Sequence, residues 1–261
     1  METSNSSFTY KNFTAVLKKY QYNFNTGDIV AGIIFSIENK CVLVDIGANL
    51  VGHLPLEEIG MNKVDSVSKD IQLNEIRELY IILFDPLNDQ IILSLKRVHG
   101  LKTWKRIRQI YEENIIFQTQ LIKLNKGGYV VEFEGLKGFI PKSHIVYNNN
   151  NISSNKAIYV KILEFNEISN YLLLSERCAY LQQNINMFRL GMITEGIVES
   201  VQNYGLFLNV QNLKGLLHIS EIQKEPNESL KDKFNIGNKV RVMIIHVDLA
   251  KGRIAFSQKN L

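Results

Sequence analysis

The chain has 261 residues, enough for two or three domains, and its apolar and charged fractions of 45% and 21% are those of an ordinary globular protein. Its net charge of +4 permits nucleic-acid binding but excludes a purely electrostatic binder of the histone kind, so any affinity for RNA must rest partly on aromatic stacking. Its two cysteines, Cys41 and Cys178, form no CxxC motif, which argues against a disulfide framework and a zinc site and fits a reducing compartment.

The N-terminal segment, residues 1–24, carries aromatic and aliphatic side chains at helix spacing. Phe13, Val16, Leu17 and Tyr20 predict a short helix before the first domain. Such a helix could cap that domain, or it could dock the protein on a partner, because it presents much aromatic surface. The absence of arginine before Arg77 is not typical of a transit or signal peptide, and no apolar run of the chain is long enough to cross a membrane.

From Gly27 onward the chain repeats one order of parts three times, with a period of about 80 residues, which suits an array of small domains. The expected repeats span residues 25–98, 113–177 and 190–261. Each reads as five short β-rich runs with turn signals between them and one long polar connection before the fourth run. This order predicts an all-β protein of three tandem five-stranded Greek-key barrels of the oligonucleotide/oligosaccharide-binding (OB) type, in which closure removes exposed sheet edges.

Short helical linkers are expected between the repeats. In residues 99–112, Trp104, Ile107 and Ile110 recur at helix spacing, with basic residues between them. One interpretation is an amphipathic linker whose Trp104 packs against a neighbouring barrel; the other is a basic ridge that contacts phosphates, and both could hold on opposite faces. The second linker, residues 178–189, shows a weaker helical pattern.

The third repeat collects residue types that suit RNA. Tyr204 and Phe207 flank the turn between its first two strands, and His218 follows Gly215-Leu-Leu in its third strand. On an exposed barrel face such rings stack on unpaired bases, at roughly 1–3 kcal/mol per base. The alternative places the rings in the core, but their combination with a histidine and late cations favours binding. The cationic candidates on or near the late strands are Lys239, Arg241 and Arg253.

This repeat resembles the RNA-binding repeat of the ribosomal protein S1 family. The resemblance is carried by Tyr204-Gly-Leu-Phe207, Gly215-Leu-Leu-His218-Ile-Ser220, Val247-Asp248 and Arg253-Ile-Ala-Phe-Ser257. It implies an S1-type OB barrel. The residues that the resemblance places on the RNA face are Tyr204, Phe207, His218, Asp248 and Arg253.

The first two repeats keep the barrel pattern but depart from this set of residues. Tyr204 corresponds to Lys40 and Gly127, Phe207 to Leu43 and Val130, and His218 to Pro55 and Pro141. Both repeats nevertheless resemble repeats of the same family, as in Gly52-His-Leu-Pro55 and Gly138-Phe-Ile-Pro141-Lys-Ser143. Three repeats over nearly the whole chain resemble the short plastid or cyanobacterial form of that family.

No catalytic constellation is visible: the histidines are scattered, and nucleotide loops, nucleophile elbows and clustered carboxylates are absent. We expect a protein that is not an enzyme and needs no cofactor or metal. The resemblance implies a small ribosomal subunit protein that binds single-stranded mRNA and supports translation initiation, with ribosomal protein and rRNA as partners and neither membrane nor small-molecule substrate. The alternative is a free RNA-binding protein that stabilises or unfolds transcripts. The expected location is the plastid (chloroplast) stroma, with an organelle gene, or else a bacterial cytoplasm.

Overall fold

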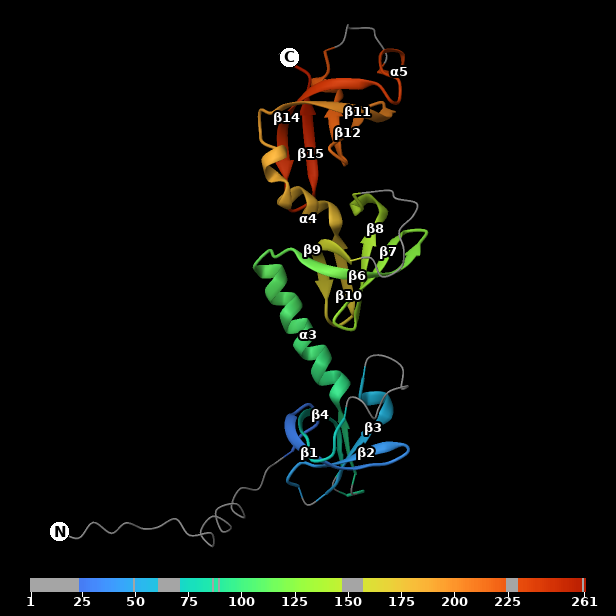
Figure 1. Cartoon of the computed structure of the whole chain (residues 1–261), viewed down its shortest axis with the longest axis vertical. Helices are drawn as coiled ribbons and strands as arrows, with labels where there is room; N and C mark the ends of the chain where they lie inside the picture. Colours follow the sequence, from blue (N-terminus) through green and yellow to red (C-terminus); the bar gives the residue numbers. More distant parts are fainter. Residues whose placement is uncertain are drawn as a thin grey trace, which may run out of the picture. The chain divides into compact units, whose positions relative to one another are not determined.

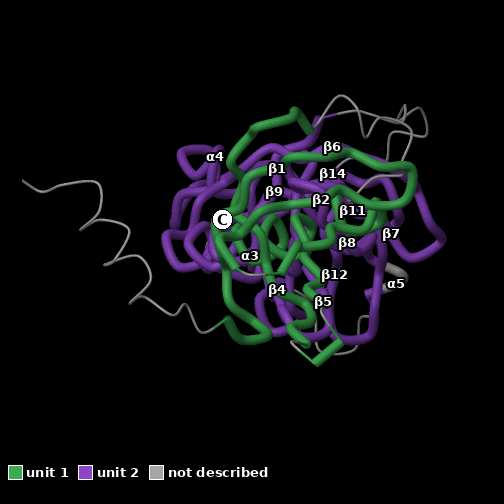
Figure 2. The backbone as a smooth tube through the Cα atoms, turned by 90° about the horizontal axis from the view of Figure 1, so that it is seen from below, with its two compact units in different colours: residues 1–102 green, residues 103–261 purple. Residues whose placement is uncertain are grey.

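The computed structural model describes residues 24–48, 50–60, 71–85, 87–88, 90–146, 157–223, 230–259 and 261. The chain divides into two compact units, residues 1–102 and 103–261 (Figure 2). Within the described residues the strands form three closed barrels of five strands each, which confirms the all-β class and the OB-type barrels (Figure 1). The helix expected over residues 1–24 falls, except for Phe24, outside this part of the chain. None of the described helices is long and apolar enough to span a membrane.

The first unit holds one barrel with the strand order β1-β2-β3-β5-β4. Alternate residues of each strand face its core, as Val42 and Val44 do in β2, because successive side chains of a strand point to opposite faces. The pair β3–β5 is parallel and the other pairs are antiparallel, which closes the sheet. The elements are β1 (Ile29–Ile37), β2 (Cys41–Asp45), β3 (Gly52–Pro55), η1 (Leu56–Glu58), β4 (Ile76–Asp85) and β5 (Gln90–Ser94).

The second unit holds two barrels that repeat this order, each with its own hydrophobic core. The second barrel consists of β6 (Phe117–Asn125), β7 (Gly128–Phe133), β8 (Leu136–Pro141), η2 (Lys142–His144), β9 (Ala157–Asn166) and β10 (Tyr171–Ser175). The third consists of β11 (Ile193–Gln202), β12 (Gly205–Val210), β13 (Leu213–His218), η4 (Ile219–Glu221), α5 (Leu230–Lys233), β14 (Lys239–Asp248) and β15 (Arg253–Ser257).

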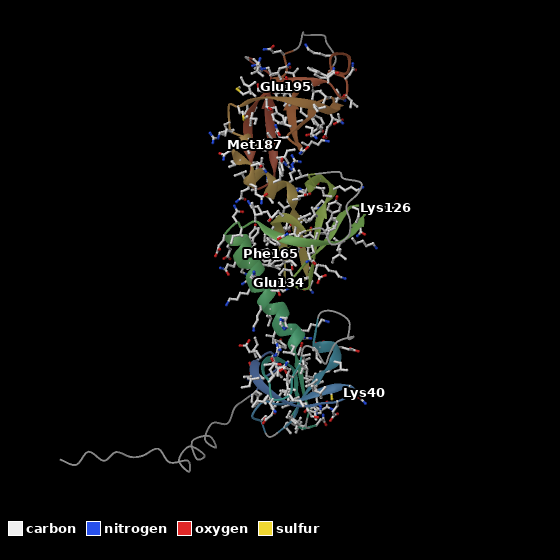
Figure 3. All side chains as sticks on the ribbon, in the orientation of Figure 1. Lys40, Lys126, Glu134, Phe165, Met187 and Glu195 are labelled. Carbon is white, nitrogen blue, oxygen red and sulfur yellow. The ribbon has the colours of Figure 1, made fainter. Side chains whose placement is uncertain are left out.

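The first linker is helix α3 (Leu95–Glu112). Trp104 is 8% exposed and lies in the core cluster of the second barrel, where its ring stacks on Phe165 at a centroid distance of 6.3 Å. This confirms that the linker tryptophan packs on a neighbouring barrel. Arg106 pairs with Glu134, and Arg108 Nη2 lies 2.6 Å from Glu167 Oε1. Figure 3 labels Glu134 and Phe165. Two cations of the expected basic ridge are therefore held by carboxylates of the second barrel, which favours the packing interpretation over the phosphate-contacting one.

The second linker, α4 (Glu176–Gln183) followed by η3 (Ile185–Met187), joins the two barrels of the second unit. The Ser175 hydroxyl caps α4 by accepting the backbone N–H of Cys178 at 3.0 Å. Cys178 is fully buried, and its Sγ donates to the carbonyl of Ala250 in the third barrel at 3.4 Å. Leu181 lies in the core cluster of the third barrel, so α4 is packed on both sides.

Candidate nucleic-acid interface

The hairpin of β12 and β13 brings Tyr204 and His218 together. Gly205 lies opposite His218 in the strand register, and the backbone N–H of Ile219 donates to the carbonyl of Tyr204 at 2.9 Å. Gly205 has a φ of 152°, and a Cβ atom there would lie 2.3 Å from the carbonyl oxygen of Leu217. Only glycine therefore allows the two strands to approach this closely beside Tyr204.

The two rings of the predicted pair stand at right angles. Their centroids are 6.2 Å apart with an interplanar angle of 90°, and Tyr204 is 49% exposed while Phe207 is half-buried. Two bases stacked on these rings would also lie at a steep angle to each other. The arrangement therefore suits an unpaired, bent strand and not the parallel bases of a duplex.

His218 is exposed at the end of β13, and its Nδ1 accepts the backbone N–H of Ser220 at 3.3 Å. The Ser220 hydroxyl lies 2.9 Å from the same nitrogen. Because Nδ1 is an acceptor here, the neutral ring carries its proton on Nε2. That N–H is a hydrogen-bond donor next to Tyr204.

Arg253 is exposed on β15, and Asp248 lies opposite it on β14. The Asp248 carboxylate accepts the backbone N–H groups of Ala250 and Lys251, each at 3.0 Å. The hydrogen bond from Lys251 is the main cause that holds the pKa of Asp248 below its usual value. Asp248 thus caps the turn that carries Arg253, and its Oδ1 is committed to the backbone.

A groove of about 500 Å³ lies on the third barrel, and neither His218 nor Asp248 is among its lining residues. Of the predicted residues it brings together Tyr204, Phe207 and Arg253. Lys239 and Arg241 do not line it: they lie on the first half of β14, opposite Ile197 and Glu195 of β11. Lys239 Nζ is also 3.6 Å from a carboxylate oxygen of Glu195.

The groove is also lined by three cationic or titratable residues that the sequence analysis did not single out: Arg177, Lys214 and His246. Lys214 Nζ lies 4.7 Å from the centroid of the Phe207 ring and 3.4 Å from Glu199 Oε2. Its place directly before Gly215-Leu-Leu-His218 was the available signal for it. Arg177 comes from α4, in the linker after the second barrel, and no motif within the third repeat includes it.

The strand registers confirm the alignment of the three repeats. Gly205 opposite His218 matches Cys41 opposite Pro55 in the first barrel and Gly128 opposite Pro141 in the second. Lys40, labelled in Figure 3, and Gly127 therefore take the place of Tyr204. The first two barrels lack the ring and the imidazole that the third presents at these positions. No group of three or more potential metal ligands occurs among the described side chains.

Comparison with known proteins decides the family. The S1 RNA binding domain family matches residues 23–96 and 188–259, which contain the first and third barrels. The small ribosomal subunit protein bS1c of Porphyra purpurea is 42% identical over the full length of both chains. The chain belongs to the bS1 family of small ribosomal subunit proteins.

A second bS1 relative, protein bS1A of Synechocystis, is 36% identical over 99% of this chain and 79% of its own. Protein bS1c of Spinacia oleracea is 31% identical over 98% of this chain and 62% of its own. These matches run through all three barrels and both linkers. They confirm that the predicted resemblance to a short three-repeat bS1 protein holds for the chain as a whole.

Proposed function

We propose that this bS1 protein binds unpaired messenger RNA on the third barrel and holds it at the small ribosomal subunit during translation initiation, without catalysing a reaction. The observation that carries the proposal is the groove of the third barrel, where Tyr204, Phe207 and Arg253 converge. Membership of a family of small-subunit ribosomal proteins supports the ribosomal setting.

Binding in this groove would combine stacking with charge. Bases stack on Tyr204 and Phe207, and Arg253 neutralises a phosphate. Outside the lining of the groove, next to Tyr204, the Nε2–H group of His218 donates to an oxygen or a base edge. Each contact is weak, and the ribosome raises the effective concentration of the tethered barrel. Such a site captures many leader sequences, because every base has a face on which a ring can stack.

The first two barrels would serve mainly to dock the protein on the ribosome. This division of labour rests on the residues that replace Tyr204 and His218 in the first two barrels. We also propose a plastid location, because relatives named bS1c come from Porphyra purpurea and Spinacia oleracea and another bS1 relative comes from Synechocystis.

Sedimentation tests the function. The chain should co-migrate with small subunits after nuclease treatment has removed messenger RNA, because docking by the first two barrels does not require it. It should also recruit an unstructured leader RNA to those subunits, and a version with Tyr204 and Phe207 changed to alanine should dock without recruiting. A chain that leaves the subunits after nuclease treatment would be a free RNA-binding protein instead.

A further inference from the structure

A second groove, of about 710 Å³, lies between the second and third barrels within the unit of residues 103–261. From the second barrel it is lined by Lys142 and Ser143 of η2, and from the third by Phe207, Asn209 and Lys214. Arg177, Phe207 and Lys214 also line the groove of the third barrel. The two grooves are therefore continuous through these three side chains.

The charge of the second groove is positive. Its described lining contains three cations, Lys142, Arg177 and Lys214, and one carboxylate, Glu199. Glu199 is already engaged, because it pairs with Lys214 at 3.4 Å and accepts a hydrogen bond from Asn209 Nδ2 at 2.7 Å. An anion that enters this groove thus meets cations whose charge is only partly compensated.

Arg177 stands where the grooves meet. Its Nη2 donates to the carbonyl of Lys214, whereas its buried Nε has no hydrogen-bond partner within the described part of the chain. Buried polar groups without a partner are rare in folded proteins. Burial lowers the pKa of Arg177, and the nearby charge of Arg253 lowers it further. A phosphate between the two guanidinium groups would relieve this repulsion.

The walls of the groove are held by packing between the barrels. Cys178 Sγ lies against the Ala250 carbonyl, and a Cβ atom on Gly252 would lie 3.0 Å from the same sulfur. Val146, just after η2, packs on the core of the third barrel, and its backbone N–H donates to Glu176 of α4 at 3.0 Å. The groove therefore exists before any ligand binds, which limits the ordering cost of binding.

We propose that this groove is a second segment of a single RNA path, in which Arg177 and Lys142 bind the phosphates of the nucleotides next to those stacked on Tyr204 and Phe207. The proposal rests on the proposed function, because the RNA strand enters from the third barrel. The continuity of the grooves through Phe207 favours a nucleic acid over an acidic peptide, which has no bases to stack on that ring. The second barrel thus contributes to RNA binding through its η2 edge.

The test uses the full chain and two fluorescent oligouridines, of about four and about twelve nucleotides. The short one suits the groove of one barrel, and the long one can also reach the second groove. Lys142→Gln and Arg177→Gln each remove one groove cation. Arg189→Gln is the matched control, because Arg189 is exposed and lines neither groove. Affinity is measured by anisotropy at several salt concentrations, with melting curves for every variant.

For the long oligonucleotide, we expect each groove variant to bind about tenfold more weakly and to lower the salt slope by about one unit, as the loss of one phosphate contact requires. For the short one, Lys142→Gln should bind like the parent chain, because Lys142 does not line the groove of the third barrel. Lys142 is exposed, so this variant tests the path even if Arg177→Gln loosens α4.

The proposed second segment of the RNA path would be overturned if the long oligonucleotide bound equally well to Lys142→Gln, Arg177→Gln and Arg189→Gln. If changing Tyr204 to alanine still weakened binding in the same assay, the proposed function would stand without it. Conversely, if the parent chain bound neither oligonucleotide, the proposed function would fail first. The last experiment measures binding of an oligoglutamate peptide. If the peptide bound tightly and lost affinity in Lys142→Gln and Arg177→Gln, while RNA affinity did not change in these variants, the groove would belong to a protein partner and the proposal would be overturned.

Discussion

His144 Nδ1 lies 2.9 Å from Ser175 Oγ and ties the short helix after β8 to the last residue of β10. The other two barrels make the same connection with a glutamate: Ser94 Oγ donates to Glu58 at 2.6 Å, and Ser257 Oγ donates to Glu221 at 2.7 Å. In each barrel the bond joins the short helix after the third strand to the last residue of the fifth strand, and these two strands pair in parallel. Only the second barrel makes this connection with a histidine, the side chain whose unperturbed pKa lies nearest to neutral pH.

This difference predicts a pH-dependent stability for the second barrel. Burial holds the pKa of His144 below its ordinary value, and the charges of Arg177 and Arg253 lower it further. The unfolded chain therefore takes up the proton first, at about pH 6.5. The stability due to the neutral ring is complete above that pH and is lost as the pH falls toward the folded pKa.

We expect the melting temperature to fall more for the parent chain than for His144→Gln between about pH 7.5 and pH 5.5. Glutamine keeps a hydrogen-bonding side chain but does not titrate. Calorimetry at both pH values provides the measurement, and the carboxylates shared by the two proteins cancel in the comparison. Parallel pH profiles for the two proteins would show that His144 does not carry this dependence.

The aromatic pair of the third barrel should dominate RNA affinity. Changing both Tyr204 and Phe207 to alanine should weaken binding of an unstructured RNA by roughly 2–6 kcal/mol, since two stacking surfaces are lost. Tyr159→Ala is the control, because it removes a tyrosine that is 53% exposed on β9 of the second barrel. A fluorescence titration measures both variants, and duplex RNA should compete poorly. Unchanged binding by a folded double variant would place the RNA face elsewhere.

Arg253 and Arg241 should differ, although both are exposed arginines of the third barrel. Arg253→Ala should lower the slope of log affinity against log salt by about one unit, because Arg253 lines the groove beside Tyr204. Arg241→Ala should change it less, because that residue lies opposite Glu195 at the other end of β14. Titrations at a series of salt concentrations separate the two, and equal slopes for both variants would contradict the assignment of the groove.

Trp104 should stabilise the second barrel. Trp104→Ala removes a ring that is 8% exposed and stacked on Phe165, which should cost about 3–5 kcal/mol of unfolding free energy. Leu101→Ala, at a position of α3 that is 50% exposed, should cost far less. Limited proteolysis should reveal faster cleavage near Lys105 only in the tryptophan variant. Similar cleavage and melting for both variants would mean that α3 is a free spacer.

Much of the site could be predicted because its signals are local in sequence. Tyr204, Gly205 and Phe207 form one turn and the start of one strand, so their spacing already places both rings near the same end of a barrel. The arginine at the start of β15 could be placed as well, because the short turn after Asp248 leads directly into it. The positions of Lys239 and Arg241 on β14 could not, because their charge carries no information about which end of the strand meets the groove.

The sequence by itself determined three OB-type barrels, the burial of Trp104 against a barrel and the aromatic pair of the third repeat, because alternation, helix spacing and turn glycines act over a few residues. Only the tertiary structure decided which cations join that pair. A strand rises about 3.3 Å per residue, so Lys239 and Asp248, at the two ends of β14, are separated by the length of the barrel. Arg177 lies on α4, and Phe207 lies on β12, after the rest of the linker and β11. The two side chains line the same groove only because α4 packs between two barrels, which depends on long-range contacts and not on local sequence pattern.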